Sequence, residues 1–519
     1  IRRAEAESKG YKASVEQMYY GNQQFLFIYE QFDDVRLVGA PPSSIGKFGG
    51  DTDNWIWPRH TGDFSMFRVY ASKDNRPAAY SPQNVPYRPK KHFSISTKGV
   101  KEGDFTMIYG FPGNTQEYIL SDAVAYIAER SDPAKIAIRT GRLDIITKAQ
   151  ESDPALRIHY AAKHASIANA WKKWQGEALG INRRGTVAAK FDYETQFGLW
   201  SVGRPEYAGV VMGLRAEYDR IMDAYFAYEI TRETLSTLPA AYTPEERAEE
   251  CFARRKFAEQ ALWRHAFREY GRCPKVYRTP SYAEGMARYK SPEAYADALF
   301  EAVWEGSDSV AMQPAVRLRE ETKRMLDHIS WMLGTKSLRN LNSKILNELY
   351  TTYIKGLREW DRERAFYPDA NLTLRVAYGS VAGYEYADGE YHKPQTTLDG
   401  IIAKDNPEIY DYDIPQSLRD LYASKNYGRW GTVIDGRRTV PVCFLATNHT
   451  TGGNSGSPVL NAGGELIGIN FDRTWRSTMS DIAFDPAICR NIAVDIRYVL
   501  FVVDRVGGAG YLLKEMTLK

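Results

Sequence analysis

The stretch Thr450–Val459, with the sequence TTGGNSGSPV, places a serine between glycines and between two segments that predict strands, 440–446 and 465–471. Glycines allow the backbone to turn sharply, so that the hydroxyl of Ser455 can project into a cleft. The same turn can aim the backbone amides of Gly453 and Ser455 at one point, where they would stabilise an oxyanion. An ordinary turn rich in Gly, Ser and Asn is the alternative. The pattern predicts that Ser455 is a catalytic nucleophile.

A serine nucleophile needs a base and a carboxylate that orients the base. Asp63 is the candidate carboxylate, because it directly precedes a predicted strand with the sequence FSMFRV, residues 64–69. This arrangement is similar to the aspartate-bearing strand of trypsin-like peptidases. A turn or cap aspartate after Gly62 is the alternative.

The histidine base is harder to place. The chain has eight histidines: His60, His92, His159, His164, His265, His328, His392 and His449. None lies in the sequence context that trypsin-like barrels use for the base. His60 is only three residues from Asp63 on the same loop, so we interpret it as a structural neighbour of the site. His449 is six residues before Ser455, with no obvious way to face its hydroxyl. In trypsin-like folds the order is His, Asp, Ser, so we expect the catalytic histidine to lie outside this chain, in an N-terminal portion.

Composition excludes several classes of protein. The 519 residues are 43% hydrophobic and 26% charged, with a net charge of +3, so nucleic acid is not an expected partner. No apolar run approaches the roughly 20 residues of a membrane span. Neither a metal nor an organic cofactor is expected, because no cluster has ligand spacing and no Gly-rich phosphate loop opens a helix. The four cysteines could form the pairs Cys251–Cys273 and Cys443–Cys489, or remain four buried thiols.

The predicted elements change in character along the chain. The segment 24–40 predicts two strands with Asp33 and Asp34 near the turn between them. Further strand-like segments at 64–70 and 105–113 are followed, from about residue 118 to 360, by helical periodicity. The clearest helical segments are 161–174, 217–235, 244–270 and 316–333. Strand-like segments return at 373–379, 439–444 and 466–471 and in the apolar run 498–503. This order favours one β domain interrupted by a helical insertion over three independent modules.

Several longer motifs resemble one family of enzymes. The motifs are FGGDTDNW (48–55), WPRHTGD (57–63), HASIANAW (164–171), TTGGNSGSP (450–458) and VDIRYVL (494–500). They resemble the bacterial dipeptidyl-peptidase seven/eleven family of serine exopeptidases. The resemblance implies a mixed β and α fold: a chymotrypsin-like double β-barrel with a large inserted α-helical cap, the N-terminal part of the barrel domain being absent from this chain. The expected domains are 1–117 (β-barrel part), 118–365 (helical cap) and 366–519 (second β-barrel).

The resemblance also assigns a site for the substrate's N-terminal ammonium. It assigns this role to Asn54, Trp55, Asn169 and Asp472. The set is chemically sensible, because amide oxygens and one carboxylate can accept from an ammonium while an indole ring forms a wall. Without the resemblance, a loop turn, a helix surface and a strand end would explain these residues equally well. An ammonium site that lies two substrate residues from the nucleophile implies release of dipeptides from a free N-terminus.

Arg473 is expected to set specificity. It lies 18 residues after Ser455, just past a predicted strand, in the region that forms the S1 pocket wall of trypsin-like barrels. A guanidinium there would pair with an Asp or Glu side chain in two hydrogen bonds, and an uncharged side chain would leave a buried cation unpaired. The family's acidic-specific branch carries arginine at this position. A surface arginine beside Trp475 is the alternative.

The expected function is therefore a serine exopeptidase that releases dipeptides whose second residue (P1) is Asp or Glu. A glutamyl endopeptidase and a non-catalytic binder of acidic N-terminal dipeptides are the rival hypotheses. The resemblance further implies a homodimer, a signal peptide outside this chain, and a periplasmic, cell-surface or secreted location.

Overall fold

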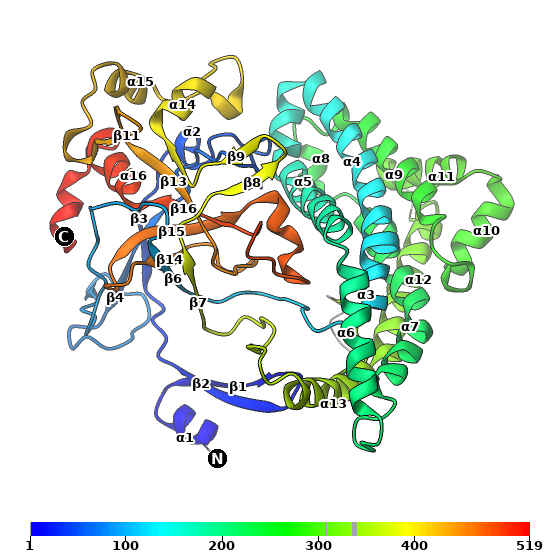
Figure 1. Ribbon diagram of the computed structural model, residues 1–519. Coiled ribbons are helices and arrows are strands. Elements are labelled where there is room, and N and C mark those ends of the chain that lie inside the picture. Colours follow the sequence, from blue (N-terminus) through cyan, green and yellow to red (C-terminus); the bar gives the residue numbers. More distant parts are fainter. Residues whose placement is uncertain (1, 307–308, 335–339) are drawn as a thin grey trace. The chain divides into compact units, whose positions relative to one another are not determined.

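The computed structural model describes residues 2–306, 309–334 and 340–519, which form two compact units (Figure 1). Unit 1 combines Ile1–Tyr118 with Tyr367–Lys519, and unit 2 is Ile119–Phe366. Every strand of the described residues belongs to unit 1, whereas unit 2 is helical. The mixed β and α character predicted from the sequence is therefore confirmed.

A seven-stranded antiparallel sheet organises unit 1. The strand order is β10-β13-β16-β15-β14-β6-β7. The bounds are β6 Phe105–Gly110, β7 Arg375–Ser380, β10 Gln395–Thr397, β13 Pro441–Ala446, β14 Ser457–Leu460, β15 Leu466–Arg473 and β16 Asn491–Asp495. The edge strands β10 and β7 do not pair with each other, so the paired strands do not close into a barrel. One isolated bridge, between Val381 and Ala446, joins the chain after β7 to β13.

Four smaller sheets complete the β structure of the described residues. They pair β1 Lys12–Met18 with β2 Gln23–Tyr29, β3 Val35–Gly39 with β4 Met66–Ala71 and β5 Val85–Pro86, β8 Tyr384–Ala387 with β9 Glu390–His392, and β11 Thr432–Ile434 with β12 Arg437–Thr439. The two strands predicted within residues 24–40 are present, but they do not pair with each other. β2 pairs with β1, and β3 pairs with β4. The segment between β2 and β3 therefore connects two different sheets and is not a hairpin turn.

Apolar side chains cover the central strands of the large sheet. Every residue of β13 and β16 is buried, which fits strands that are covered on both faces. Val442 and Leu445 belong to one apolar cluster, whereas Phe444 belongs to a second cluster with Ile108 and Val459. This packing fixes the strands from which the residues around Ser455 project.

Unit 2 is built of helices with short connections. Its helices are α3 Ser121–Tyr126, α4 Asp132–Ser152, α5 Pro154–Arg183, α6 Thr186–Ser201, α7 Val210–Glu233, α8 Pro244–Ala248, α9 Lys256–Tyr270, α10 Pro280–Tyr289, α11 Pro292–Glu305, α12 Gln313–Leu333 and α13 Lys344–Trp360. The sequence predicted one helix over 244–270, but a turn and a short 3-10 helix separate α8 from α9. No helix in the described ranges combines the length and apolarity needed to cross a bilayer.

The apolar run 498–503 was predicted as a strand, and this prediction is wrong. Residues Ile496–Phe501 form helix α16, and a π-helical turn follows at Val502–Val506. The Asp495 carboxylate caps the helix by accepting from the backbone amide of Arg497 at 2.9 Å. All six residues of α16 are buried, so the segment has no polar face whose period could have distinguished helix from strand. The other helices of unit 1 are α1 Arg2–Ser8, α2 Ser43–Gly46, α14 Leu398–Lys404 and α15 Gln416–Ala423.

The structure decides between the two alternatives for the cysteines. Cys251, Cys273, Cys443 and Cys489 are all free and buried. Burial raises the pKa of the Cys443 thiol to about 12 and that of the Cys489 thiol to about 11. These two thiols are therefore protonated and unreactive at neutral pH.

Candidate active site

The turn that carries Ser455 requires glycine at position 453. Gly453 has φ of +107°, and a Cβ added to it would lie 2.4 Å from the Phe111 carbonyl oxygen. Strand β15 anchors the other side of the turn. The backbone amide of Gly456 donates to the Asn470 carbonyl at 2.7 Å, and the Asn470 side-chain amide donates to the carbonyl of Asn454 at 3.1 Å. The turn is thus held between β15 and the chain after β6.

Two amides of this turn have no acceptor among the described residues. The amides of Asn454, Gly456 and Ser457 all donate to backbone carbonyls, whereas those of Gly453 and Ser455 donate to none. Both residues are exposed. Two neighbouring amides that face solvent are the donors that an oxyanion site requires.

The Ser455 hydroxyl donates to the carbonyl of Phe471 at 3.3 Å. Phe471 lies at a bulge, because Asn470 pairs with Ala493 while Asp472 already pairs with Ile492. A bulge inserts one unpaired residue and changes the direction of the side chains that follow it. The bulge therefore lies beside the serine and sets the directions of Asp472 and Arg473.

Asp472 is already paired within unit 1. Its Oδ2 accepts from Arg59 at 2.6 Å and from the backbone amide of Trp55 at 3.4 Å. Both members of the ion pair are nearly buried, with side chains 8% and 10% exposed. Trp55 itself has φ of +66°, so the loop 49–63 bends sharply where it meets β15. A substrate ammonium at Asp472 would share this carboxylate with Arg59.

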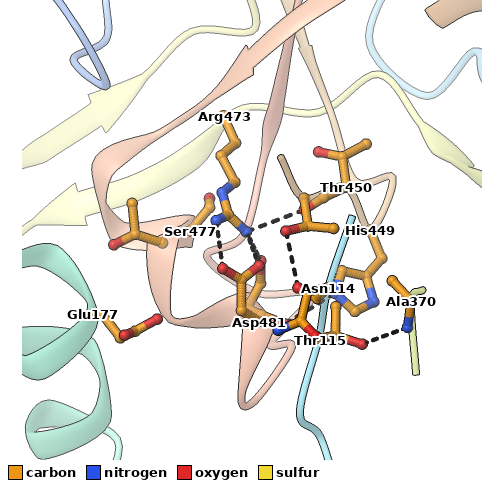
Figure 2. A network of polar contacts seen from close by, with 12 residues as sticks. Asn114, Thr115, Glu177, Ala370, His449, Thr450, Arg473, Ser477 and Asp481 are labelled. Atoms are coloured by element: carbon orange, nitrogen blue, oxygen red, sulfur yellow. Dashed lines mark hydrogen bonds and ion pairs between the residues drawn. The ribbon is translucent and has the colours of Figure 1, made fainter. Parts of the chain in front are cut away.

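Arg473 is 4% exposed, so the alternative of a surface arginine is wrong. Its guanidinium makes two hydrogen bonds with Asp481, at 2.6 and 2.9 Å. It also donates to the Ser480 hydroxyl at 2.9 Å and the Thr450 carbonyl at 3.2 Å, and it lies 5.6 Å from the centre of the Trp55 ring. Figure 2 shows the guanidinium directed at Asp481 and Thr450.

Asp63 lies near the Arg59–Asp472 pair. The pKa of the Asp63 carboxyl is raised above its ordinary value, mainly by burial. The Arg59 guanidinium opposes this rise, and the Asp472 carboxylate adds to it. The Asp63 residue is nevertheless exposed to solvent. The two observations agree if the carboxyl lies in a recess, where it touches water but is surrounded by protein. One region of unit 1 therefore contains Asp63, Asp472 and Ser455. Ser455 belongs to it because its hydroxyl donates to the carbonyl of Phe471, the residue before Asp472.

No histidine of the described residues is hydrogen-bonded to the Ser455 hydroxyl. The His449 Nε2–H donates to the Ser480 carbonyl at 3.0 Å, and its ring stacks on Phe484 at 4.5 Å between centroids. His60 is 4% exposed, and its ring packs directly against Gly400. Burial lowers the pKa of His449 to about 4 and that of His60 to about 3. Both are neutral structural residues, as the sequence predicted for His60.

The other predicted contacts for the ammonium lie in different parts of the chain. Asn54 is half-buried and precedes Trp55 in the loop that reaches Asp472. Asn169 is an exposed residue of α5 in unit 2. The roles of both residues stay predictions.

One cluster in unit 2 has ligand types suited to a metal ion: His159, Glu249 and Cys251. The buried guanidinium of Arg255 lies among them, 2.7 Å from His159 Nε2 and 3.1 Å from Glu249. A fixed positive charge bonded to two of the three candidate ligands opposes cation binding.

A family model described as Peptidase S46 matches residues 1–251 and 240–518, essentially the whole chain. The chain belongs to the Peptidase S46 family. The S46 match extends over both the helical unit and the turn at Ser455, and the prediction of a peptidase is confirmed.

Named relatives agree with this assignment. A protein of Capnocytophaga gingivalis named Asp/Glu-specific dipeptidyl-peptidase is 43% identical, over 97% of this chain and 76% of its own. Dipeptidyl-peptidase 7 of Phocaeicola vulgatus is 35% identical, over 98% of this chain and 76% of its own. The crystal structure of Porphyromonas endodontalis DPP11 in complex with the dipeptide Arg-Glu matches with a TM-score of 0.84 and 34% identity, over 99% of this chain and 79% of that one.

Sequence reasoning missed three residues of this candidate site. Asn470, which anchors the serine turn, is the one polar side chain of the segment 466–471, and that contrast was a usable signal. Arg59 was part of a quoted motif, but nothing local indicates its pairing with Asp472. Asp481 had no signal at all, because its partner Arg473 is eight residues away and is reached only through the fold of the intervening 3-10 helix.

Proposed function

We propose that this chain is a serine-type dipeptidyl-peptidase that releases N-terminal dipeptides with Asp or Glu at P1. Arg473 carries the proposal: a buried guanidinium on the strand whose Phe471 carbonyl accepts from the Ser455 hydroxyl. The planar N–H donors of this guanidinium match the two oxygens of an Asp or Glu carboxylate, whereas an apolar P1 side chain cannot accept from them. The names of the relatives support the same specificity.

In this proposal Ser455 attacks the carbonyl of the P1 residue. The solvent-facing amides of Gly453 and Ser455 stabilise the oxyanion, which is worth about 2.7–4 kcal/mol per donor in other serine peptidases. Asp63 orients the base that removes the Ser455 proton, and its position near the Arg59–Asp472 pair supports that role.

We further infer that the substrate's ammonium is bound by Asn54, Trp55, Asn169 and Asp472. The contact between the Trp55 amide and Asp472 supports the inference for those two residues, because it joins the loop 49–63 to β15. The Arg59–Asp472 pair leaves that carboxylate little net charge. Neutral amide acceptors therefore contribute much of the specificity for an ammonium.

The proposal also includes the double-barrel architecture with an inserted helical cap. We infer that the seven-stranded sheet corresponds to the second barrel of a double-barrel peptidase and residues 118–365 to the helical cap. The bridge between Val381 and Ala446 supports the barrel, since it connects one end of the sheet's strand order back to β13. A homodimer and a periplasmic, cell-surface or secreted location follow from the family resemblance. Light scattering and cell fractionation test them.

The decisive assay uses the protein together with the N-terminal portion that is expected to supply the catalytic histidine. The substrate is fluorogenic, with Glu at P1 and a free amine, and it is compared with a Leu substrate and with the N-acetylated Glu substrate. We expect cleavage of the first alone. Cleavage of the acetylated substrate would indicate an endopeptidase, because an exopeptidase needs the free ammonium.

A fluorophosphonate probe separates an enzyme from a peptide-binding protein. An activated Ser455 reacts with the probe, and the Ser455→Ala variant is the matched control. Binding of acidic dipeptides without labelling or cleavage would identify a non-catalytic binder and refute the proposal.

A further inference from the structure

Asp481 holds the guanidinium of Arg473 within unit 1. The ion pair has two hydrogen bonds, and its side chains are 5% and 15% exposed. A buried guanidinium paired in this way is electrically neutral as a unit. The earlier expectation, that a P1 side chain without charge leaves this cation unpaired, therefore does not hold: Asp481 already neutralises it.

The position of Asp481 is fixed from both sides of its peptide. The backbone amide of Gln116 donates to the Asp481 carbonyl at 2.6 Å. The carbonyl of the preceding residue, Ser480, accepts from His449 Nε2–H at 3.0 Å. His449 is itself held by stacking on Phe484. These contacts connect the Asp481 peptide to the segments that follow β6 and β13, so its carboxylate is held where it meets Arg473 (Figure 2).

A substrate carboxylate that reaches Arg473 adds a second negative charge to one guanidinium. Like charges a few ångströms apart in a partly buried site repel strongly, and two carboxylates then share one cation. The gain from binding an acidic side chain is smaller than an unpaired arginine would provide. In return, the free enzyme avoids the cost of a buried unpaired charge.

We propose that Asp481 is a specificity-determining residue: its carboxylate is the internal counter-ion of Arg473, and its charge limits the preference for acidic over neutral P1 side chains. This inference rests on the proposed function and assigns a role to a residue that acts through Arg473. Asp481 is thus a positioning and charge-balancing residue and makes no contact with the reacting carbonyl.

The test is Asp481→Asn, which removes the charge and retains one oxygen acceptor for Arg473. The ratio of kcat/KM for Glu to kcat/KM for Gln at P1 is measured for wild type and variant. We expect the ratio to rise by about tenfold or more, mainly through a lower KM for the Glu substrate. We also expect Asp481→Asn to melt at a lower temperature than wild type and the dipeptide Arg-Glu to restore more of its stability than Arg-Gln does, because only the former supplies the missing negative charge.

Two variants serve as controls. Asp481→Glu keeps the charge and should retain the wild-type ratio to within about threefold, so an equal rise in both variants would show that geometry and not charge is responsible. Asp495→Asn removes the partner of another buried arginine, Arg497, which is held at 2.7 and 2.9 Å. It should lower stability without changing the ratio and without selective recovery by Arg-Glu.

An unchanged or lower ratio in Asp481→Asn, with wild type preferring Glu, overturns this inference alone. A wild-type protein with no preference for acidic P1 residues refutes the proposed function instead. If Asp481→Asn does not fold, inhibition of the wild type tests the inference instead. We expect the inhibition constant of Arg-Glu to be lower than that of Arg-Gln by a factor smaller than about a thousand. A larger difference would mean that Arg473 acts as an unpaired cation, which costs about 3–5 kcal/mol when buried.

Discussion

Asp472 and Arg473 are neighbours in the chain, yet each is paired with a different residue of opposite charge. Asp472 binds Arg59, and Arg473 binds Asp481. Successive residues of a strand point to opposite sides, and the bulge at Phe471 adds to the separation. In the proposed function, this one short segment would provide both a carboxylate for the substrate's ammonium and a guanidinium for an acidic P1 side chain.

Replacing Arg473 with glycine tests its proposed role in the P1 pocket. We expect Arg473→Gly to lose most activity on Glu at P1 and to gain relative activity on Leu, because the cation is gone and space is created. The measurement is kcat/KM for both substrates. The single variant removes the two hydrogen bonds that Arg473 donates to the Asp481 carboxylate, so we expect it to be less stable than wild type.

The double variant Arg473→Gly, Asp481→Ala is therefore the matched control, since it removes both charges. It should cleave the Leu substrate better than the single variant does. Unchanged selectivity for Asp and Glu in either variant would contradict the assignment of Arg473 to the P1 pocket.

At the scale of elements, the turn 452–456 is determined by its backbone. Gly453 adopts a conformation that other residues adopt only with strain, and it approaches the Phe111 carbonyl too closely for a Cβ. Asn470 on β15 then connects the turn to the sheet. Ser455, the proposed nucleophile, is thus positioned by the glycine turn and by strand β15.

Gly453→Ala tests this turn. The added methyl group requires the turn to move away from Phe111, and the left-handed conformation costs about 1–3 kcal/mol. We expect kcat to fall by a factor of about 100 or more, because the amide at 453 leaves its position as an oxyanion donor, while KM changes little. Gly452→Ala is the control, since a Cβ there meets no atom within 4 Å. Equal loss in both variants would contradict the proposed role of the amide.

At the scale of the molecule, two neutral buried histidines make the fold sensitive to acid. The pKa values of His60 and His449 are about 3 and about 4 in the folded protein, below the ordinary value of 6.5. The unfolded chain therefore takes up these protons first, so stability is present above pH 6.5 and is lost as the pH falls below it. Each histidine contributes a loss of about 1.4 kcal/mol per pH unit until its folded pKa is reached.

We expect the melting temperature to fall between pH 7 and pH 5, in a range where most carboxylates are still ionised. His60→Gln should make this fall shallower, because one of the two groups no longer binds a proton on unfolding. A melting temperature that is independent of pH over this range would contradict the burial of both rings in their neutral form.

Local sequence patterns predicted the β, then helical, then β order of the chain, because hydrophobic periodicity and glycine placement are properties of neighbouring residues. They failed at 498–503, where a fully buried helix has no polar face and therefore no period. They also could not predict strand partners, since β2 and β3 each pair with a strand other than the one that the spacing favoured.

The sequence by itself determined that Ser455 sits on a glycine turn and that an arginine follows it on the next strand, because both depend on residues close together in the chain. Only the tertiary structure decided that Arg473 is neutralised by Asp481, that Asp472 is shared with Arg59, and that the cysteines are free. Charge pairing and burial depend on which distant segments meet, and no local pattern carries that information.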